Sequence, residues 1–361
     1  MAEINREELL NCALCPNMCR CECPVVRTAG REAVAPSGKA RLAAMLNDRH
    51  LEWQEDYLDA LSGCLGCSGC TIHCPFDELS LCDELRLSRL EAKSSGVFLP
   101  ESMPYLNNLR NYGSPYGRRP DNSFRKSSRG DVLFFSGCTS LTNHPQSVEA
   151  AIYLLDRAGV SWQMIEEDCC GFPAEVWGDL KLARQLAEEN KRKIEENGAA
   201  TLVTNCPECW LVFSDRYPDW GFDLQMEIVD GPTYFLNLVN QGLLQPGEIE
   251  PKVVTYHDPC IWARTAKKIE EPRKILQGIP GLQIEEAYMH SELTRCCGGG
   301  NMFQLAFPST ASAIAEERLQ ELPEVEAIVT ACPFCREGLN RGNRQVIELV
   351  ELLAQSCRLS V

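Results

Sequence analysis

The stretch EEDCCGFP, residues 166–173, places two cysteines side by side and follows them with glycine. The same arrangement returns as LTRCCGGG at residues 293–300. The side chains of adjacent residues diverge, so a disulfide between neighbouring cysteines is strained. A doubled cysteine that occurs twice in the same setting therefore indicates a repeated use of free thiols.

Each doubled cysteine is the centre of a group of five. One cysteine lies 31 residues before the first pair and 36 residues before the second. A C-P-x-C motif begins 36 and 35 residues after the second cysteine of each pair. A tetrahedral zinc site needs only four ligands, so five cysteines in each half indicate a larger cofactor. The two groups are Cys138, Cys169, Cys170, Cys206 and Cys209, and Cys260, Cys296, Cys297, Cys332 and Cys335.

Short apolar segments and amphipathic segments alternate around both groups, in a repeat of about 120 residues. The order strand, helix, strand, helix, strand predicts a parallel sheet with covering helices. Ligand sites in open parallel sheets lie beyond the carboxyl ends of the strands, where these cysteines occur. The predicted strands are 131–138, 161–168, 200–206, 252–260, 282–290 and 326–332, and the predicted helices are 147–159, 179–198, 271–280 and 310–322.

Glycine and proline occupy matching positions in the two groups. Gly171 and Gly298 follow the cysteine pairs, and we expect them to let the backbone approach the site closely. Pro207 and Pro333 are expected to stiffen the C-P-x-C turns and so to hold two thiolates together.

Two further runs of four cysteines occur before residue 75. The second run, C-x2-C-x2-C-x3-C-P, is the bacterial ferredoxin pattern, in which the fourth cysteine ligates the other cubane. The first run has one extra residue, which leaves Cys21 as an alternative ligand. Zinc is the alternative metal, because C-x2-C pairs also build zinc sites. If the fourth cysteine of each run ligates the cluster of the other run, one [4Fe–4S] cluster is held by Cys64, Cys67, Cys70 and Cys23. The other is held by Cys12, Cys15, Cys19 and Cys74.

The chain divides into four predicted segments. Residues 1–96 show helical periodicity at 36–63 and 77–93 and no convincing strand, so we predict a helical two-cluster domain. Residues 97–130 are rich in Pro, Gly, Asn, Ser and Arg, which predicts a linker or extended arm. Residues 131–249 and 250–361 form the two repeats, and the segment 344–359 is predicted to be a helix that packs internally.

Composition narrows the class of protein. The chain has 361 residues, 21 cysteines and a net charge of −16. The negative charge argues against a nucleic-acid partner. We find neither a signal-peptide pattern nor an apolar run that would span a membrane. A cytosolic chain of this length rarely carries many disulfides, so metal ligation in the cytoplasm is favoured.

The complete cysteine pattern resembles the CCG (cysteine-rich) domain family, which includes the catalytic subunit of heterodisulfide reductase. The layout is similar to iron–sulfur proteins related to the D-subunit of heterodisulfide reductase and to the iron–sulfur subunits of glycolate oxidase systems. The resemblance implies a helical, ferredoxin-like bis-[4Fe–4S] domain followed by two repeated α/β CCG domains with small parallel sheets. The residues that carry it are CPVVRTAGREAVAPSGKARL (23–42), YHDPC (256–260) and CCGGGNMF (296–303).

The resemblance also implies cofactors and partners. Each complete CCG motif would hold a non-cubane [4Fe–4S] cluster with its five cysteines, giving one or two such clusters beside the two cubanes. No glycine-rich dinucleotide fingerprint follows a strand, so flavin or NAD is expected in another subunit. The partner would be a flavoprotein, either an FAD-linked dehydrogenase or an electron-transferring flavoprotein. The acceptor would be a quinone or a thiol–disulfide carrier, which leaves open peripheral association with the inner face of the membrane.

These inferences favour an iron–sulfur electron-transfer subunit of a flavin-linked oxidoreductase complex, in anaerobic metabolism. The main alternative is a catalytic disulfide reductase that binds substrate sulfur at a CCG-domain cluster. A zinc-binding structural scaffold is the least favoured alternative.

A few residues outside the cysteine groups also carry predictions. His257 and Asp258 precede Cys260, and are candidates for proton transfer beside the cluster because histidine titrates in the right range. The simpler interpretation, which we favour, is a hydrogen-bonding pair that orients the cysteine-bearing turn. Cys82 and Cys357 are expected to be buried, small hydrophobic residues, and His73 a surface or packing residue.

Overall fold

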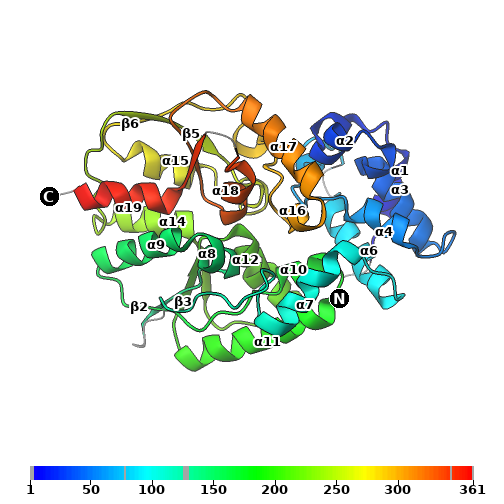
Figure 1. The fold of residues 1–361 in the computed structure, drawn as a ribbon, viewed down its shortest axis with the longest axis horizontal. Helices are drawn as coiled ribbons and strands as arrows, with labels where there is room; N and C mark the ends of the chain where they lie inside the picture. Colours follow the sequence, from blue (N-terminus) through cyan, green and yellow to red (C-terminus); the bar gives the residue numbers. More distant parts are fainter. Residues whose placement is uncertain (1–3, 77–78, 125–129, 342–343, 360–361) are drawn as a thin grey trace.

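The computed structural model describes residues 4–76, 79–124, 130–341 and 344–359. A helical N-terminal region lies at one end of the molecule, and two α/β halves make up the rest (Figure 1). Each half is built on a parallel sheet of four strands.

The N-terminal region is a small bundle of helices. Helix α1 begins at Asn5, whose side chain accepts hydrogen bonds from the N–H groups of Glu7 and Glu8. Leu9, Leu61 and Leu85 are fully buried where the apolar faces of the helices meet. The described part of this region contains no strand, as predicted, although residues 77 and 78 of one predicted helix lie outside it. The helices are α1 (Arg6–Leu14), α2 (Pro24–Ala29), α3 (Pro36–Asn47), α4 (Glu55–Ser62), α5 (Gly69–Ile72) and α6 (Leu81–Ser94).

The segment that follows, predicted to be a linker or an extended arm, is not extended throughout. It contains helix α7 (Met103–Tyr112), which ends at Gly113 in the left-handed conformation. Leu106 and Leu109 of α7 are buried in the core of the first half. Two leucines three residues apart thus attach α7 to that core, and the surrounding Pro, Asn and Gly residues obscure this short pattern in the sequence.

The two sheets have the same topology. The strand orders are β2-β1-β3-β4 and β6-β5-β7-β8, and every pairing is parallel. In each sheet, the second strand in chain order lies on one side of the first strand, and the third lies on the other side. This reversal of strand order opens a crevice at the carboxyl ends of the two central strands. The strands are β1 (Val132–Phe134), β2 (Trp162–Gln163), β3 (Thr201–Thr204), β4 (Glu227–Asp230), β5 (Lys252–His257), β6 (Leu282–Ile284), β7 (Ala327–Thr330) and β8 (Gln345–Glu348).

Three strands of each sheet occur where the sequence predicts them, and the fourth strands are new. Strand β8 corrects the prediction of one helix over residues 344–359, because the helix there, α19 (Leu349–Leu359), begins only after the strand. The remaining helices of the two halves are α8 (Cys138–Asn143), α9 (Pro145–Arg157), α10 (Phe172–Val176), α11 (Leu180–Asn197), α12 (Pro207–Leu211), α13 (Tyr217–Asp219), α14 (Gly231–Asn240), α15 (Glu270–Gln277), α16 (Phe303–Ala306), α17 (Pro308–Glu321) and α18 (Pro333–Leu339). Single turns of 3-10 or π-helix, η1 to η6, lie at Met18–Glu22, Glu32–Val34, Pro100–Ser102, Val212–Arg216, Ile261–Thr265 and Ser291–Leu293.

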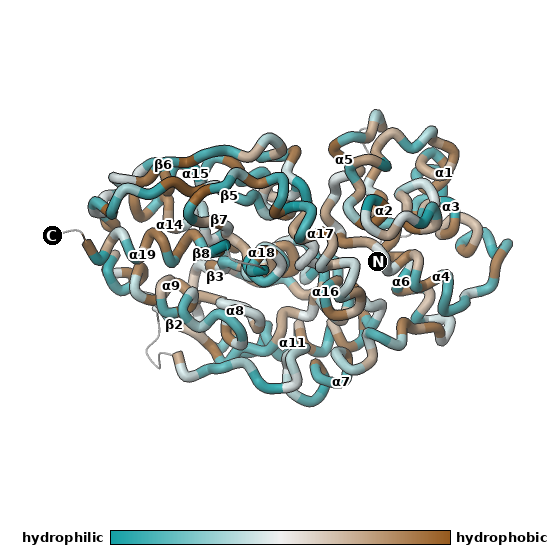
Figure 2. Tube along the Cα trace, turned by 45° about the horizontal axis from the view of Figure 1, so that its top comes forward, coloured by the Kyte–Doolittle hydropathy of each residue, from teal (hydrophilic) through white to brown (hydrophobic). Residues whose placement is uncertain are grey.

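The two halves share their apolar cores. Helix α19, at the end of the second half, packs against α9 of the first, and Figure 1 shows the two side by side. Apolar stretches run along α14 and α19 (Figure 2), and their buried residues join one core that contains both sheets. The C-terminal helix therefore packs internally, as its periodicity predicts. Among the described residues, no helix combines the length and apolarity that a membrane span requires.

Candidate metal centres

The first group of five cysteines converges at the carboxyl end of the first sheet. Cys138 follows β1 and opens α8, and the doubled cysteine follows β2. Cys206 follows β3 as the residue that precedes α12, and Cys209 lies in that helix. All five line one small, buried cavity, which we call the first five-thiol site.

The thiols contact one another in the same order in both halves. In the first half the hydrogen-bonded order is Cys138, Cys169, Cys170, Cys209, Cys206. In the second half it is Cys260, Cys296, Cys297, Cys335, Cys332, which we call the second five-thiol site. Bonds with neighbouring thiols hold the pKa of Cys170, and equally of Cys297, well below its usual range. The second cysteine of each pair is the middle thiol of its group.

The glycine after each cysteine pair was predicted to let the backbone approach the metal site, but the structure shows that it lets the backbone approach a neighbouring helix. Gly171 has a φ of +99°, and a Cβ there would lie 2.9 Å from the carbonyl oxygen of Ala183 in α11. Gly298 has a φ of +78°, and its Cβ would lie 2.6 Å from the carbonyl oxygen of Ala311 in α17. A side chain at either position is therefore disfavoured by the positive φ and also by the short contact with a carbonyl oxygen. These glycines let the cysteine loop approach the neighbouring helix rather than the metal site.

The C-P-x-C motifs are helix beginnings. Pro207 and Pro333 occupy the first positions of α12 and α18, where the missing N–H costs nothing. One cysteine of each motif therefore precedes the helix and the other lies in its first turn. The positive end of the helix dipole favours thiolates at both positions.

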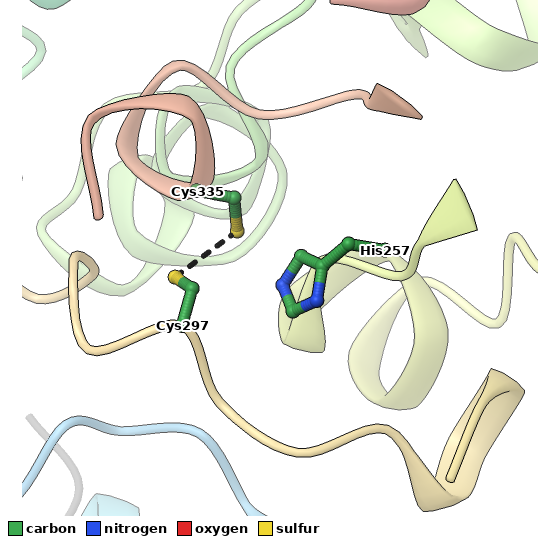
Figure 3. A group of neighbouring side chains, drawn as sticks. All are labelled: His257, Cys297 and Cys335. Carbon is green, nitrogen blue, oxygen red and sulfur yellow. Dashed lines mark hydrogen bonds between the residues drawn. The ribbon is translucent and has the colours of Figure 1, made fainter. Parts of the chain in front are cut away.

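His257 distinguishes the second five-thiol site from the first. It ends β5, is 1% exposed, and its ring points toward the sulfurs of Cys297 and Cys335, which are 3.3 Å apart (Figure 3). These three ligand atoms lie within 4.8 Å of one another. Arg318 donates to Nδ1 at 3.4 Å, which assigns the ring proton to Nε2 on the side of Cys297. Burial lowers the pKa of His257. Phe135 holds the matching position in the first half, three residues before Cys138.

Asp258 belongs to the scaffold of the second site. Its carboxylate accepts two hydrogen bonds from Arg273, at 2.7 and 2.9 Å, and one from the N–H of Ser291 at 2.8 Å. Its carbonyl oxygen accepts from the hydroxyl of Thr294 at 3.2 Å, two residues before the cysteine pair. The structure thus separates the two candidates: His257 faces the thiols, and Asp258 holds the loop that carries them.

The two five-thiol sites face each other across Glu208. This residue is 4% exposed and lies inside the first C-P-x-C motif. One carboxylate oxygen accepts from the N–H of Asn301 at 2.6 Å, and the other has no partner among the described residues. Burial, the bond to Asn301 and the charges of Cys170 and Cys297 act on this carboxyl, and burial raises its pKa to about 8.

The two ferredoxin-type runs exchange their fourth cysteines in space. Cys12, Cys15, Cys19 and Cys74 surround a cavity of about 340 Å³, which we call the distal site. Cys23, Cys64, Cys67 and Cys70 line a second, small cavity, which we call the proximal site. These are the two groupings that the ferredoxin pattern predicts, and their role as cluster ligands stays a prediction.

Three further residues lie differently from their predictions or decide between them. Cys21 is exposed, its thiol donates to the carbonyl oxygen of Met18 at 3.3 Å, and it does not line the distal cavity. Cys82 lines the proximal cavity as a fifth thiol beside Cys64 and Cys70, so it is not a simple packing residue. His73 lines the distal cavity, whereas Cys357 is buried in the apolar core as expected.

The proximal site adjoins the second five-thiol site. The thiols of Cys67 and Cys296 are hydrogen-bonded neighbours, and this contact lowers the pKa of Cys67. Asn301, in the glycine-rich loop after the cysteine pair, donates from its side chain to the carbonyl oxygen of Cys64 at 2.8 Å. Arg295 pairs with Glu22 at 3.0 Å across the same interface. The thiol groups therefore form a series: distal, proximal, second and first five-thiol site.

The residues present fit iron–sulfur clusters. Each cavity of the N-terminal region is lined by cysteines drawn from both runs, as two cubanes in one domain require. Five buried or half-buried thiols in each later half exceed the four that a tetrahedral zinc ion takes. Lys39 buries an ammonium group against the proximal thiols, which suits an anionic occupant.

Comparison with known families decides the class. A family model described as "Cysteine-rich domain" matches residues 132–214 and 254–340, which cover both five-thiol sites. Each half of the chain therefore contains a segment that matches the cysteine-rich domain. A second model, "4Fe-4S dicluster domain", matches residues 8–77. The match covers both ferredoxin-type runs, so the chain is an iron–sulfur protein.

Three relatives illustrate the range of similar proteins. The D-subunit of the dihydromethanophenazine:CoB–CoM heterodisulfide reductase of Methanosarcina mazei is 28% identical, over 84% of this chain and 80% of that protein. The B-subunit of the fumarate reductase (CoM/CoB) of Methanothermobacter marburgensis is 30% identical, over 62% of this chain and 45% of that protein. The EtfAB:quinone oxidoreductase of Syntrophomonas wolfei is 28% identical, over 75% of this chain and 42% of that protein. All three are named as oxidoreductases or their subunits.

Sequence reasoning missed three residues of these sites. Cys82 stands alone in the chain, and only its position at the start of α6 brings it to the proximal thiols. Lys39 was part of a periodic helical segment with no sign that it is buried. The position of Glu208 could have been predicted from the sequence, because a residue inside C-P-x-C lies beside the cysteines of the site in any fold.

Proposed function

We propose that this chain is the iron–sulfur electron-transfer subunit of a flavin-linked oxidoreductase complex. The observation that supports this most directly is the series of four thiol groups, joined where Cys67 meets Cys296. Clusters held by these cysteines supply one-electron chemistry: two cubanes at the distal and proximal sites, and one or two non-cubane [4Fe–4S] clusters at the five-thiol sites. The chain itself binds no flavin or NAD in this proposal.

The protein residues insulate and hold this series. The cavity of the first five-thiol site is lined by buried side chains, which keeps water away from it. The distal cavity is instead ringed by exposed apolar side chains, with Leu14 82%, Met18 75% and Phe76 43% exposed. An apolar rim around a redox site suits transient contact with a redox partner. We therefore place the flavoprotein, a dehydrogenase or an electron-transferring flavoprotein, at the distal site.

The test is anaerobic purification of the tagged chain with analysis of iron, acid-labile sulfide, zinc and co-purified flavin. We expect about 12–16 iron atoms per chain, since three or four sites each take four, together with a flavin-containing partner. Cys15→Ser should remove the iron of one cubane, whereas the matched control Cys21→Ser should keep it. Zinc with little sulfide would refute the cluster assignment, and a chain that exchanges no electrons with any flavoprotein would refute the relay.

A second function is favoured by one specific observation. The His257 ring places its N–H beside Cys297 at the second five-thiol site, where it can donate to a sulfur. Similarity to the D-subunit of heterodisulfide reductase over most of both chains supports the same alternative, a catalytic disulfide reductase. Reduced viologen as donor, with heterodisulfide and simple disulfides as substrates, tests it directly. Turnover that falls in His257→Phe, which copies Phe135 of the first half, would favour catalysis, and absence of turnover would leave the relay.

A further inference from the structure

Lys39 is a buried cation with no carboxylate partner among the described residues. It lies on α3, is 2% exposed, and lines the proximal cavity with the cysteine thiols. Its ammonium donates a hydrogen bond to the carbonyl oxygen of Gly63. Within the described parts of the chain, neither Asp nor Glu forms an ion pair with it. A buried charge is costly unless an opposite charge compensates it.

The compensating charge comes from the cysteine side. The groups that line the proximal cavity with Lys39 and can carry a negative charge are the thiols of Cys23, Cys64, Cys67, Cys70 and Cys82. Lys39 is therefore the counter-ion of whatever negative group these thiolates hold. A cluster with four thiolate ligands is such a group, and gaining an electron makes it more negative still.

A second buried cation faces the same thiols. Arg89 on α6 is 5% exposed, and its guanidinium donates to the carbonyl oxygens of Val176 at 2.7 Å and Leu61 at 3.3 Å. Both acceptors are uncharged, and the charges of Cys64, Cys82 and Glu175 act on Arg89. The proximal site thus lies between two cations in a region that excludes water.

The distal site has a different environment. Its cavity of about 340 Å³ is bordered by exposed apolar side chains such as Leu14 and Met18. Arg41 brings a cation to this region, but it is exposed and donates to the carbonyl oxygen of Ala13 at 2.8 Å. A charge acts through an effective dielectric of about 20 near protein and about 80 in water. The charge of Lys39 therefore stabilises a negative group at the proximal site several times more strongly than the charge of Arg41 does at the distal site.

We propose that Lys39, supported by Arg89, makes the proximal site the one that is reduced more easily of the two. An electron that enters at the distal site then comes to rest beside Cys67, next to Cys296 of the second five-thiol site. This inference rests on the proposed function, and it adds the direction of flow within the chain. The step is a one-electron exchange: the group at the distal site is oxidised, the group at the proximal site is reduced, and no bond or proton changes place.

The experiment is a redox titration of the purified full chain, followed by low-temperature electron paramagnetic resonance. Cys15→Ser and Cys70→Ser assign the two cubane signals to the distal and proximal sites. In the parent protein we expect the proximal signal to appear at the higher potential. In Lys39→Gln, which keeps a donor for Gly63 and removes the charge, the proximal midpoint should move to lower potential while the distal midpoint stays.

Two controls make the result specific. Lys39→Arg keeps the charge and should leave the proximal midpoint above the distal one. Arg41→Gln removes a cation two positions along the same helix, but an exposed one, and should move the distal midpoint several times less than Lys39→Gln moves the proximal one. A distal site that is reduced first in the parent protein overturns the proposal, even if Lys39→Gln does not assemble its cluster. So does an unchanged proximal midpoint in Lys39→Gln.

These outcomes are distinct from failure of the proposed function. Iron and sulfide analysis shows whether two cubanes are present, and their absence would refute both ideas. Two cubanes with the reverse order of potentials would refute only the role of Lys39.

Discussion

Asn301 connects all three parts of the chain, and its replacement is the sharpest test of how they are held together. Its side chain donates to the carbonyl oxygen of Cys64 at 2.8 Å, and its main-chain N–H donates to Glu208 at 2.6 Å. Its φ is +57°, in the left-handed region that asparagine tolerates better than most residues. Asn301→Ala therefore removes one interface hydrogen bond and introduces backbone strain at once.

The two costs are separable. A lost hydrogen bond to a buried carbonyl costs about 1 kcal/mol. Alanine in the left-handed conformation costs about 1–2 kcal/mol more, so Asn301→Ala should cost about 2–3 kcal/mol. Asn301→Gly adopts this φ without strain, and should cost about 1–2 kcal/mol, for the bond and for the added freedom of the opened loop.

Hydrogen–deuterium exchange of the native protein measures this without assuming two-state unfolding. Because 1.4 kcal/mol is a tenfold change, peptides that cover residues 60–72 and 296–306 should exchange about 30–150-fold faster in Asn301→Ala. The increase should be about 5–30-fold in Asn301→Gly, and α19 should be unaffected in both. Equal exchange in the two variants would refute the strain, and parent-like exchange in both would refute the junction itself.

Three further predictions concern charge and ligation in the N-terminal region. Burial raises the pKa of Glu84 to about 7, so the folded state holds this proton more tightly than the unfolded state. The stability that this proton contributes is full below about pH 4.5 and is lost as the pH rises through about 7. Comparing unfolding temperatures at pH 5 and pH 8 should show that Glu84→Gln flattens this dependence, and an unchanged profile would contradict the assignment. Arg86→Met removes the nearer of two arginine partners of Glu175, whose side chain is 0% exposed and keeps Arg216 at 3.7 Å, and should cost about 2 kcal/mol in thermal unfolding. Adding Glu175→Gln should recover most of the loss, and no recovery would argue against the ion pair. Cys82→Ala should keep its iron, because four thiolates satisfy a cubane, whereas Cys70→Ala should lose about four iron atoms. Iron loss in Cys82→Ala would instead make Cys82 a ligand.

The elements that the sequence predicted are those with strong local signals. The central strands are followed within a few residues by cysteine and carry runs such as LVT and AIVT, and the covering helices show clear periodicity. Strands β4 and β8 were missed because they are four residues long and each begins and ends with polar residues. In β8 the residues also continue the apolar pattern of α19, so that one helix accounts for both equally well. Pairing with β7 decides the difference, and pairing is a non-local contact.

The candidate sites divide in the same way. Spacing along the chain predicted which cysteines group together, because cysteines at strand ends or within a few residues of each other must meet in any fold of this class. Spacing did not show which of His257 and Asp258 faces the thiols. Adjacent side chains at a strand end point in opposite directions, and the sequence does not say which direction leads to the site. The structure turns His257 toward the thiols and Asp258 toward Arg273.

By itself, the sequence predicted the class of this protein, its repeat and every member of the four thiol groups except Cys82, all from spacing and local preference. Tertiary structure alone decided how the groups are ordered and which charges surround them. Cys67 meets Cys296 because the helical region docks on the second half, through contacts such as that of Asn301 with Cys64. Lys39 faces the proximal thiols because α3 turns that side inward. Periodicity predicts that a helix has a buried face, but what lies opposite that face depends on the packing of distant segments.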